Sequence, residues 1–529
     1  MGRRGAARNR YAARTVDGYA ILLVAVLAVG AAARLLFLAD FPAGINQDEA
    51  YAGYEAYSLL HDGVDSHGYH NPVYLVAWGS GMNALYTYLS IPFVGLFGLT
   101  TWATRLPQAI LGVLTLFVFC RLMGRLSGNR RFVLLATFLL AVNPWHIMMS
   151  RWGLESNLVC AFLLFGLYFW VRGLEDSRFF LPGALCYGLS LYCYADIWIV
   201  VPVLLVLQLA YSVRVHKFHW NRWTAAACIC LVVLALPLIG FLAVNLGLAP
   251  EVRTPLFSIP RLQQMRTTDL AASPGTMGAN LMQFLRLMWV QDDGLPHSTV
   301  PGFGMYYLFS LPFLLLGLVR LLGKAVSSVR AGAYRPAALI LIQLLACVPL
   351  VLLVNVNVNR VNCVHLPLIL CGAYGLSWIA ENFRRHTMAS NGIAIAAYAV
   401  SFGLFCGTYF SPAYHAGFYK DCRDALTYAQ RAYTGQNKVC IRDINWAVVL
   451  YETGTPSPVF AETVQYRAVP AAFLDVRSFS HYAFVRQPDE VGPQDVLIYR
   501  NEDDVARRIV QERGFAVEQR DGYFVAHAK

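Results

Sequence analysis

Charged residues are scarce in this chain of 529 residues: only 14% are Asp, Glu, Lys or Arg, whereas 57% are apolar. An apolar share this large exceeds what the core of a soluble protein needs, so the composition predicts a polytopic membrane protein. The sequence also lacks a Walker loop and a glycine-rich nucleotide fingerprint, and no internal repeat is strong enough to suggest a transporter built from two halves.

Positive charge is missing from one long segment. The 64 residues between Asp40 and Arg105 contain no Lys or Arg. Six acids lie in this segment or at its start: Asp40, Asp48, Glu49, Glu55, Asp62 and Asp65. Because loops left in the cytoplasm collect Lys and Arg, we expect this loop to be translocated. The adjacent pair Asp48 and Glu49 then faces the outside, near the membrane surface.

Apolar runs of about 20 residues predict eleven membrane spans. They are expected near 18–38, 103–122, 132–149, 156–171, 179–195, 197–213, 223–246, 303–322, 336–354, 361–380 and 391–410. A basic head over residues 1–17, with no small-residue cleavage site after the first run, predicts a retained anchor and a cytoplasmic N-terminus. With this start, the head and every second loop hold twenty Lys and Arg on the inside.

The apolar run 85–99 is the one ambiguous crossing. If it crossed the membrane, every later loop would change sides and the basic clusters would lie outside. Pro92, Gly95 and Gly98 also interrupt it. We therefore predict a juxtamembrane or re-entrant piece, within a first outer loop over 39–102. A second outer loop is expected over 247–302.

The apolar runs stop at residue 411, and the tail 411–529 has a balanced charge. Its pattern predicts helices near 419–433 and 503–512, strands near 438–442, 482–486 and 496–499, and a closing strand pair around Gly522. We therefore predict a mainly α, polytopic membrane helix bundle over 18–410, with a small extracytoplasmic α/β domain at its C-terminus. A disulfide between Cys422 and Cys440 stays open, since these are the tail's two cysteines.

Two acids on the outer side are candidate catalytic groups. Asp48 opens a predicted helix together with Glu49, where acids compensate the helix dipole whatever the function. The alternative is a general base whose neighbour binds a metal ion or forms a hydrogen bond. Glu155 lies at the outer mouth of a span, so it could be merely solvated or could share a pocket with Asp48. Asp196, in an outer turn, is interpreted as a turn acid.

Arg360 lies among asparagines just before an apolar span, in the run Asn355 to Asn362. It could be an anchor at a helix end, but polar residues this dense at membrane depth favour a phosphate-binding edge. Arg151 could pair with Glu155, four residues later. The loose spacing of His61, His67 and His70 favours surface histidines over a metal site. The net charge of +11 does not indicate nucleic acid, because the basic residues sit in short loops between apolar runs.

These pieces together resemble the polyprenyl-phosphate-sugar glycosyltransferases of the GT-C fold, in the group of protein O-mannosyltransferases and lipid A aminoarabinose transferases (glycosyltransferase family 39). The resemblance covers roughly residues 20–410. The matching pieces are Asn46-Gln-Asp-Glu49, the run 79–88, Ala103-Thr-Arg-Leu-Pro107, Asn143-Pro-Trp-His146 with Ser150-Arg151 and Glu155, and Asn359-Arg-Val-Asn362. Where the aminoarabinose transferases carry a Lys after the first loop, this chain has Met82-Asn83.

The resemblance implies that Asp48 deprotonates or orients an acceptor hydroxyl, which attacks the anomeric carbon with inversion as polyprenyl phosphate leaves. It implies catalytic roles for Glu155 and Glu49 as well. Arg360 is the first candidate to stabilise the leaving phosphate, with Arg151 and Arg105 behind it. The remaining substrate-binding candidates are Asn83, His146, Asn359 and Asn362. No cofactor is assigned; a divalent metal ion held by Asp48 and Glu155 is left open.

The sequence therefore predicts a multi-pass enzyme of the cell membrane that moves a monosaccharide from a polyprenyl-phosphate carrier to an extracytoplasmic protein, lipid or cell-wall glycan. The expected partners are the lipid-linked donor, membrane lipids and the acceptor. The alternative is a transporter or flippase of lipid-linked sugars. A transporter would need polar groups along a crossing path, whereas the polar candidates favour one face.

Overall fold

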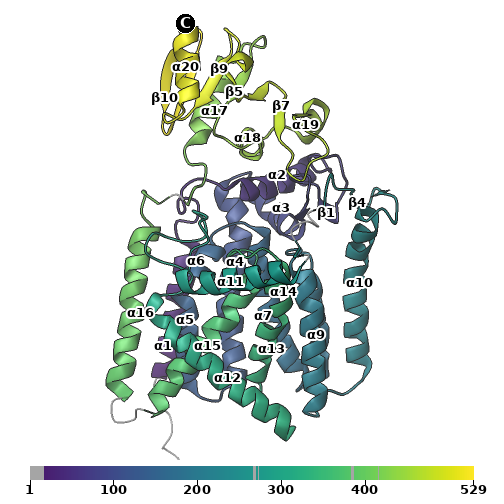
Figure 1. The fold of residues 1–529 in the computed structure, drawn as a ribbon, viewed down its shortest axis with the longest axis vertical. Helices are drawn as coiled ribbons and strands as arrows, with labels where there is room; N and C mark the ends of the chain where they lie inside the picture. The colour runs from purple at the N-terminus through teal and green to yellow at the C-terminus, as the bar shows by residue number, and fades with distance from the viewer. Residues whose placement is uncertain (1–16, 266–269, 272, 383–386, 415) are drawn as a thin grey trace, which may run out of the picture.

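A computed structural model describes residues 17–265, 270–271, 273–382, 387–414 and 416–529. The predicted basic head lies outside these residues except for Asp17. In the described parts, a bundle of long helices carries a separate sheet domain at one end (Figure 1). We call this the upper end of the bundle.

Eight helical segments among the described residues are long and apolar enough to cross a membrane. They are α1 (Gly18–Leu35), α4 (Thr101–Leu126), Glu155–Gly173 with α7 (Leu158–Gly173), α9 (Ile197–Arg214), α10 (Arg222–Asn245), Leu308–Ala331 with α12 (Leu311–Ala331), α15 (Asn362–Asn382) and Gly392–Tyr409 of α16 (Thr387–Tyr409). A bent pair, α5 (Arg130–Ala141) and α6 (Pro144–Ser150), meets at 59° and makes a ninth span if it is counted as one.

The other two of the eleven predicted spans are also helical but short. Helix α8 (Phe180–Ser190) begins only after a 3-10 turn at Ser177–Phe179, and α13 (Ala338–Ala346) is separated from α14 (Val348–Leu353) by Cys347. The prediction of eleven full-length spans therefore overcounts the long helices. Apolar composition marked these segments correctly as helix, but it did not show where turns end them.

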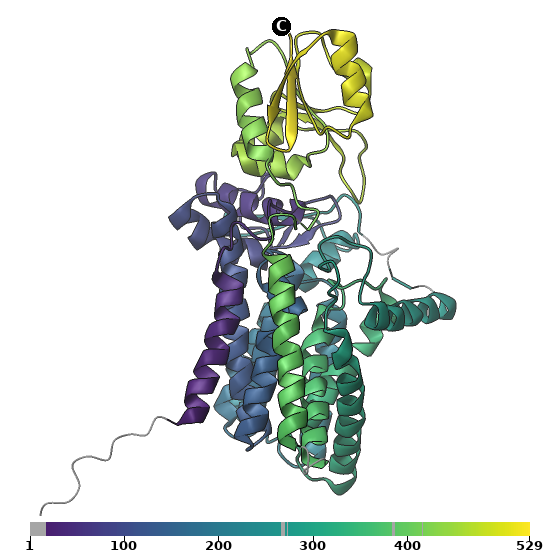
Figure 2. The ribbon, with the colours of Figure 1, turned by 90° about the vertical axis from the view of Figure 1, so that its left-hand side faces the viewer.

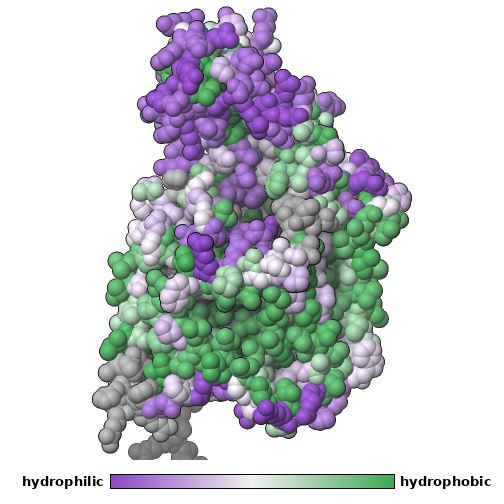
Figure 3. Space-filling view, in the orientation of Figure 1, coloured by the Kyte–Doolittle hydropathy of each residue, from purple (hydrophilic) through white to green (hydrophobic). Residues whose placement is uncertain are grey.

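The basic loops among the described residues meet at the end of the bundle opposite the sheet domain, which we call the basic end. Asp17 pairs with Arg130 at 2.7 Å and Arg125 pairs with Glu175 at 2.5 Å. Arg214 donates to the carbonyl of Arg330 at 3.4 Å. Figure 3 shows an apolar band around the middle of the bundle, with hydrophilic surface above and below it. The chain is thus a multi-pass membrane protein with its basic loops on one side.

The upper end carries short elements that do not run through the bundle. Helices α2 (Gln47–His61) and α3 (Leu85–Phe97) pack side by side beneath the sheet domain, and α3 is too short to span a bilayer alone (Figure 1). Two small antiparallel pairs, β1 (Tyr74–Leu75) with β2 (Met82–Asn83) and β3 (Val252–Arg253) with β4 (Ser258–Ile259), complete this layer. Helix α11 (Pro274–Val290) lies across the bundle axis (Figures 1 and 2).

The C-terminal domain is a seven-stranded mixed sheet with the order β10-β11-β9-β5-β8-β7-β6. The strands are β5 (Val439–Ile441), β6 (Gln465–Tyr466), β7 (Val476–Phe479), β8 (Tyr482–Phe484), β9 (Val496–Tyr499), β10 (Ala516–Arg520) and β11 (Tyr523–His527). Strand β5 pairs in parallel with both β8 and β9, and the other pairs are antiparallel. The α/β prediction is confirmed, and Cys422 and Cys440 are buried and unbridged.

Four helices complete this domain: α17 (Cys422–Ala432), α18 (Trp446–Thr453), α19 (Ser457–Thr463) and α20 (Asp504–Arg513). Helix α18 packs on α2 of the first loop. The ring of Trp446 lies 5.2 Å from that of Trp78 and 5.8 Å from that of Tyr51. Tyr54 donates to the carbonyl of Thr455 at 2.6 Å, and Asn445 donates to Gln47 at 3.0 Å. The domain is therefore seated on the first loop through both apolar and polar contacts.

Candidate active site

A cavity of about 860 Å³ lies between the upper ends of the helices and the C-terminal domain. Its polar wall comes from five segments of the chain. The polar lining includes Asp48 on α2, Asn83 on β2, Glu155 at the start of the α7 segment, Asp196 before α9, and Asn359 and Arg360 before α15. Five of the predicted site residues thus share one cavity. The fold brings these residues together because their segments all end at the upper end of the bundle.

Asp48 sits in the first turn of α2, half-buried at the cavity wall. The helix begins with a capping box: the Asn46 side chain accepts from the backbone N–H of Asp48 at 2.9 Å, and Glu49 reaches back to the N–H of Asn46 at 3.4 Å. The N-terminal end of a helix stabilises a carboxylate. Local sequence therefore fixes the position of Asp48 and favours its ionised form.

Glu155 lies on a short 3-10 turn at the mouth of the bundle and is 9% exposed. Its Oε2 accepts a hydrogen bond from the backbone N–H of Asn83. The Asn83 side chain donates to the Tyr74 hydroxyl at 3.4 Å, whereas its buried Oδ1 has no hydrogen-bond partner within the described structure. This contact ties the first loop to the start of α7. The side-chain oxygen of Asn83 is a separate buried acceptor at the cavity wall.

Arg360 lies in the irregular segment between α14 and α15. Its backbone N–H donates to Asn357 at 2.9 Å, and its guanidinium donates to the carbonyl of Asn355 at 3.2 Å. Asp293, from the second outer loop, accepts from the N–H of Val358 at 2.9 Å. The asparagine-rich run therefore serves mainly to hold this segment in place, because its polar groups form hydrogen bonds with backbone groups that no helix pairs. It holds Arg360, half-buried, at the cavity.

Glu49 and Arg105 are fully buried and do not line the cavity. They form a two-point ion pair with distances of 2.9 and 3.0 Å. Glu49 also accepts from the N–H of Gly153 at 2.9 Å, and Arg105 donates to the carbonyls of Leu38, Pro42 and Gly44. Both residues were predicted to act at the substrate, whereas in the structure their polar groups hold the first loop in place.

Arg151 and His146 are also structural in this geometry. Arg151 does not pair with Glu155. Its guanidinium makes five hydrogen bonds to four backbone carbonyls at and just after the end of α1, including those of Leu36 and Phe37 at 2.8 Å each. His146 accepts a hydrogen bond from the guanidinium of Arg34. The same guanidinium also donates to the carbonyls of Gly30, Leu140 and Ala141. We call Arg34, Arg105 and Arg151, all fully buried, the arginine frame.

Asn362 is buried beneath the cavity wall. Its side chain accepts from the indole of Trp145 at 3.0 Å and donates to Asn157 at 3.1 Å. Asn362 therefore holds the turn that carries Glu155. This place beneath the wall differs from the predicted contact with substrate. Of the asparagines in this run, Asn359 does line the cavity, and its buried Oδ1 has no hydrogen-bond partner in the described part of the chain.

The donor set does not fit a protein-held metal centre. Across the described ranges, no three His, Cys, Asp or Glu side chains lie close enough together to hold a metal ion. Asp48 and Glu155 share the cavity with Asp196 and Asp475, but no three of these described acids lie close enough together to hold a metal ion. Two of the loop histidines have separate contacts. The rings of His61 and Tyr57 lie 4.3 Å apart in a tilted arrangement. His67 lies against Ser66, and burial lowers the His67 pKa to about 4. We therefore derive no step through a metal.

Some lining residues were missed by sequence reasoning. Asp196 was interpreted as a turn acid, although the same topology that placed Asp48 and Glu155 outside placed it beside them. The C-terminal domain contributes a further wall, with Asn445, Trp446, Phe473, Leu474, Asp475 and Arg486. Arg486 pairs with Asp475 at 2.6 Å across this wall. No local motif marks these residues, since only the docking of the domain brings them to the cavity.

Comparisons with known proteins agree with this architecture. Residues 84–240 match the model of the family described as dolichyl-phosphate-mannose-protein mannosyltransferase. No curated protein matches the chain. The structure of ArnT from Cupriavidus metallidurans bound to undecaprenyl phosphate is similar with a TM-score of 0.56 at 13% identity, over 97% of this chain and 98% of that one. The apo form of ArnT gives 0.53 at 14% identity, over 96% and 97%.

The oligosaccharyltransferase of Archaeoglobus fulgidus, in a complex with zinc and sulfate, is similar with a TM-score of 0.50 at 13% identity. That match covers 82% of this chain and 61% of that one. At these identities the structures establish a shared fold, and the family match lies within the helical bundle. Together they show that the chain has the GT-C fold of these membrane proteins and that part of its bundle resembles the mannosyltransferase family model.

Proposed function

We propose that the protein transfers one sugar from a polyprenyl-phosphate carrier to a hydroxyl-bearing acceptor in the cavity at the upper end of the bundle. The observation that carries the proposal is the convergence of Asp48, Glu155 and Arg360 on one cavity. Inverting transfer needs a base for the acceptor and a cation for the leaving phosphate. This cavity has both kinds of group, on different walls.

The walls of the cavity match a donor with a charged head and an apolar tail. Arg360 supplies the cation, and the lining also has apolar residues, with Trp198 and Ile199 from α9 and Phe241 and Leu242 from α10. These helices face the apolar band of the bundle, so a polyprenyl chain could lie along them within the bilayer. The ArnT structure with bound undecaprenyl phosphate supports this class of donor.

In the proposed step, the acceptor oxygen attacks the anomeric carbon while the bond from that carbon to the phosphate oxygen breaks. The Asp48 carboxylate accepts the proton from the acceptor hydroxyl, and polyprenyl phosphate leaves as the anion. Arg360 stabilises the charge that develops on this phosphate, an effect that is strong where water is scarce. Glu155, joined to the Asn83 backbone, orients the first loop and so the approach of the acceptor.

We propose that the basic end is cytoplasmic and that the cavity and the C-terminal domain are extracytoplasmic. The clustering of basic loops opposite the cavity supports this orientation. The polar candidates gather at the cavity end, which favours transfer chemistry over a transport path through the bundle. The acceptor would then approach from the side of the C-terminal domain.

The test is turnover of radiolabelled polyprenyl-phosphate hexoses by the purified full-length protein. We expect release of polyprenyl phosphate by the wild type and its loss in Asp48→Asn, with a clear reduction in Glu155→Gln. Asp40→Asn is the matched control, because Asp40 is an exposed acid of the same loop that does not line the cavity. Normal release by both cavity variants would overturn the proposed roles.

A further inference from the structure

A second cavity, of about 630 Å³, opens at the basic end between α1, α4, α5 and α7. The proposed transfer reaction does not use it. Arginines from three helices line it: Arg121 and Arg125 from α4, Arg130 from α5 and Arg172 from α7. The rest of the lining is Tyr19, Leu23, Leu27, Phe117, Cys120, Gly124, Ser127, Gly128, Val133 and Tyr168.

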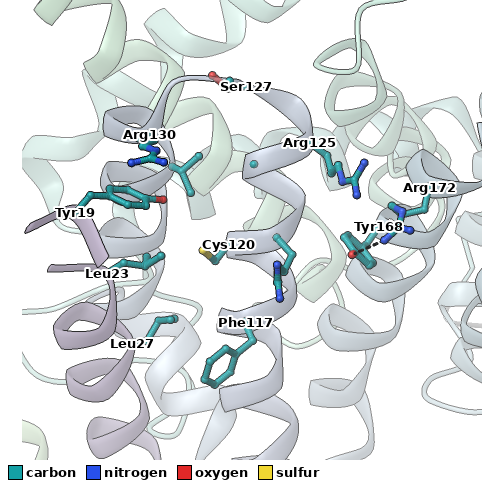
Figure 4. A pocket seen from close by; sticks show the side chains of 14 residues that line it. Tyr19, Leu23, Leu27, Phe117, Cys120, Arg125, Ser127, Arg130, Tyr168 and Arg172 are labelled. Atoms are coloured by element: carbon teal, nitrogen blue, oxygen red, sulfur yellow. Dashed lines mark hydrogen bonds between the residues drawn. The ribbon is translucent and has the colours of Figure 1, made fainter. Parts of the chain in front are cut away.

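Three of the arginines and the apolar side chains occupy different depths of this cavity. Figure 4 shows Arg130 above Tyr19 on one side and Arg125 and Arg172 on the other, near the loop that contains Ser127. Leu23, Leu27 and Phe117 lie farther from this loop, toward the middle of the bundle (Figure 4). The cavity is thus cationic at its mouth and apolar at its depth.

The positive charge at the mouth is only partly compensated. Arg130 pairs with Asp17 at 2.7 Å, and Arg125 pairs with Glu175 at 2.5 Å. Arg172 donates to the Tyr168 hydroxyl at 3.3 Å and lies 3.9 Å from Glu175.

Arg121 is exposed and has no hydrogen-bond or ion-pair partner among the described residues. The two acids therefore face four arginines, which leaves an excess of two positive charges along the cavity.

The tendency of inner loops to be basic accounts for the number of arginines, but not for their convergence on one cavity. Arginine suits phosphate, because its planar guanidinium donates two parallel hydrogen bonds to phosphate oxygens. Basic pockets between membrane helices at the cytoplasmic surface are suited to lipid head groups. A free anion would satisfy the arginines but would leave the apolar depth unfilled.

We propose that this cavity binds an anionic membrane phospholipid, with its phosphate among the four arginines and its acyl chain along Leu23, Leu27 and Phe117. Gly124 and Gly128 keep the mouth open, since a Cβ at either position would meet no other atom within 4 Å. A side chain added at Gly124 can therefore fill the cavity without disturbing the fold. This gives a variant that blocks the site and keeps every charge.

The experiment measures binding of phosphatidylglycerol and of phosphatidylcholine to the full-length protein in detergent by native mass spectrometry. We expect preferential retention of phosphatidylglycerol, and an affinity about tenfold lower in Arg121→Gln, because one charge-assisted phosphate contact is lost. Gly124→Trp should abolish the preference. Arg222→Gln, an exposed arginine of the same end that does not line the cavity, should bind like the wild type, and so should Arg360→Ala at the other cavity.

Three outcomes would overturn the proposal. Equal retention of the two lipids would show that the phosphate charge is not recognised against a zwitterion. Equal losses in Arg121→Gln and Arg222→Gln would show a general effect of surface charge. Competition by inorganic phosphate as strong as that by the lipid would show that a free anion, rather than a phospholipid, is the ligand.

Discussion

Adjacent acids of the first loop belong to two different regions of the molecule. Asp48 is half-buried at the cavity wall, whereas Glu49 is fully buried in a two-point ion pair with Arg105 of the arginine frame. The first turn of helix α2 thus contributes Asp48 to the cavity and Glu49 to the buried ion pair with Arg105. Residue type alone does not separate these roles, since both side chains are carboxylates.

The same division holds for the arginines. Arg34, Arg105 and Arg151 are fully buried, and their donors reach backbone carbonyls of other segments. Arg360 is half-buried and lines the cavity. Inside a membrane protein, an arginine whose donors are occupied by carbonyls holds the fold. One that lines a cavity can contact a ligand bound there.

The largest effect is expected for Asp48→Asn. Removing a general base lowers turnover by about 10²–10⁴-fold, and the half-buried position should leave thermal unfolding unchanged. The measurement is release of radiolabelled polyprenyl phosphate beside a thermal-unfolding curve for the same sample. If Asp48→Asn loses activity only because it unfolds, Asp48 supports the fold like Glu49, and the two acids do not have different roles.

Arg105→Met should act on stability instead. It leaves the buried carboxylate of Glu49 unpaired, and breaking a buried ion pair costs about 3–5 kcal/mol. The free energy of unfolding in detergent should fall accordingly. Arg125→Met is the matched control, because its pair with Glu175 is exposed and such pairs contribute only about 0–1 kcal/mol. Equal losses of unfolding free energy in the two variants would contradict the stabilising role of Arg105 in the arginine frame.

Arg360→Ala should weaken donor binding. Loss of one charge-assisted hydrogen bond to phosphate costs about 1.5–3 kcal/mol, which corresponds to about 10- to 100-fold in affinity. Binding of a polyprenyl phosphate measures it, with Arg261→Ala as the control: Arg261 is an exposed arginine of the second outer loop that does not line the cavity. An unchanged donor affinity would remove Arg360 from the phosphate site.

The smallest effect concerns pH and Asp65, a buried acid of the first loop that lies outside the cavity. Burial, and then the nearby Glu55, raise the pKa of the Asp65 carboxyl well above its usual range. The folded protein then holds the proton more tightly than the unfolded chain, so stability falls as pH rises from the ordinary Asp value toward the raised one.

Asp65→Asn removes this titration and keeps an acceptor for the N–H groups of His67 and Tyr69, at 2.9 and 2.8 Å. As the pH rises above the ordinary Asp value, the unfolding temperature of the variant should fall less than that of the wild type. Asp40→Asn should follow the wild type. A steeper fall in Asp65→Asn would reverse the sign of the argument.

The bundle and the first outer loop were predictable because apolar length and the distribution of Lys and Arg are encoded locally. The places of Asp48, Glu155 and Arg360 at one level followed from the same counting of crossings. The arginine frame was not predictable, because its partners are backbone carbonyls of other segments, which have no sequence signature. The wall made by Trp446 and Asp475 depends on domain docking, which the pattern of the tail does not encode.

The central claim is that Asp48 and Glu155 line one donor-binding cavity. The most direct measurement is labelling of Asp48→Cys and Glu155→Cys by a membrane-impermeant thiol reagent in oriented vesicles, with wild-type labelling subtracted. The account predicts that both positions react from the side of the C-terminal domain and that polyprenyl phosphate protects both. Reaction from opposite faces, or protection of only one position, would contradict it.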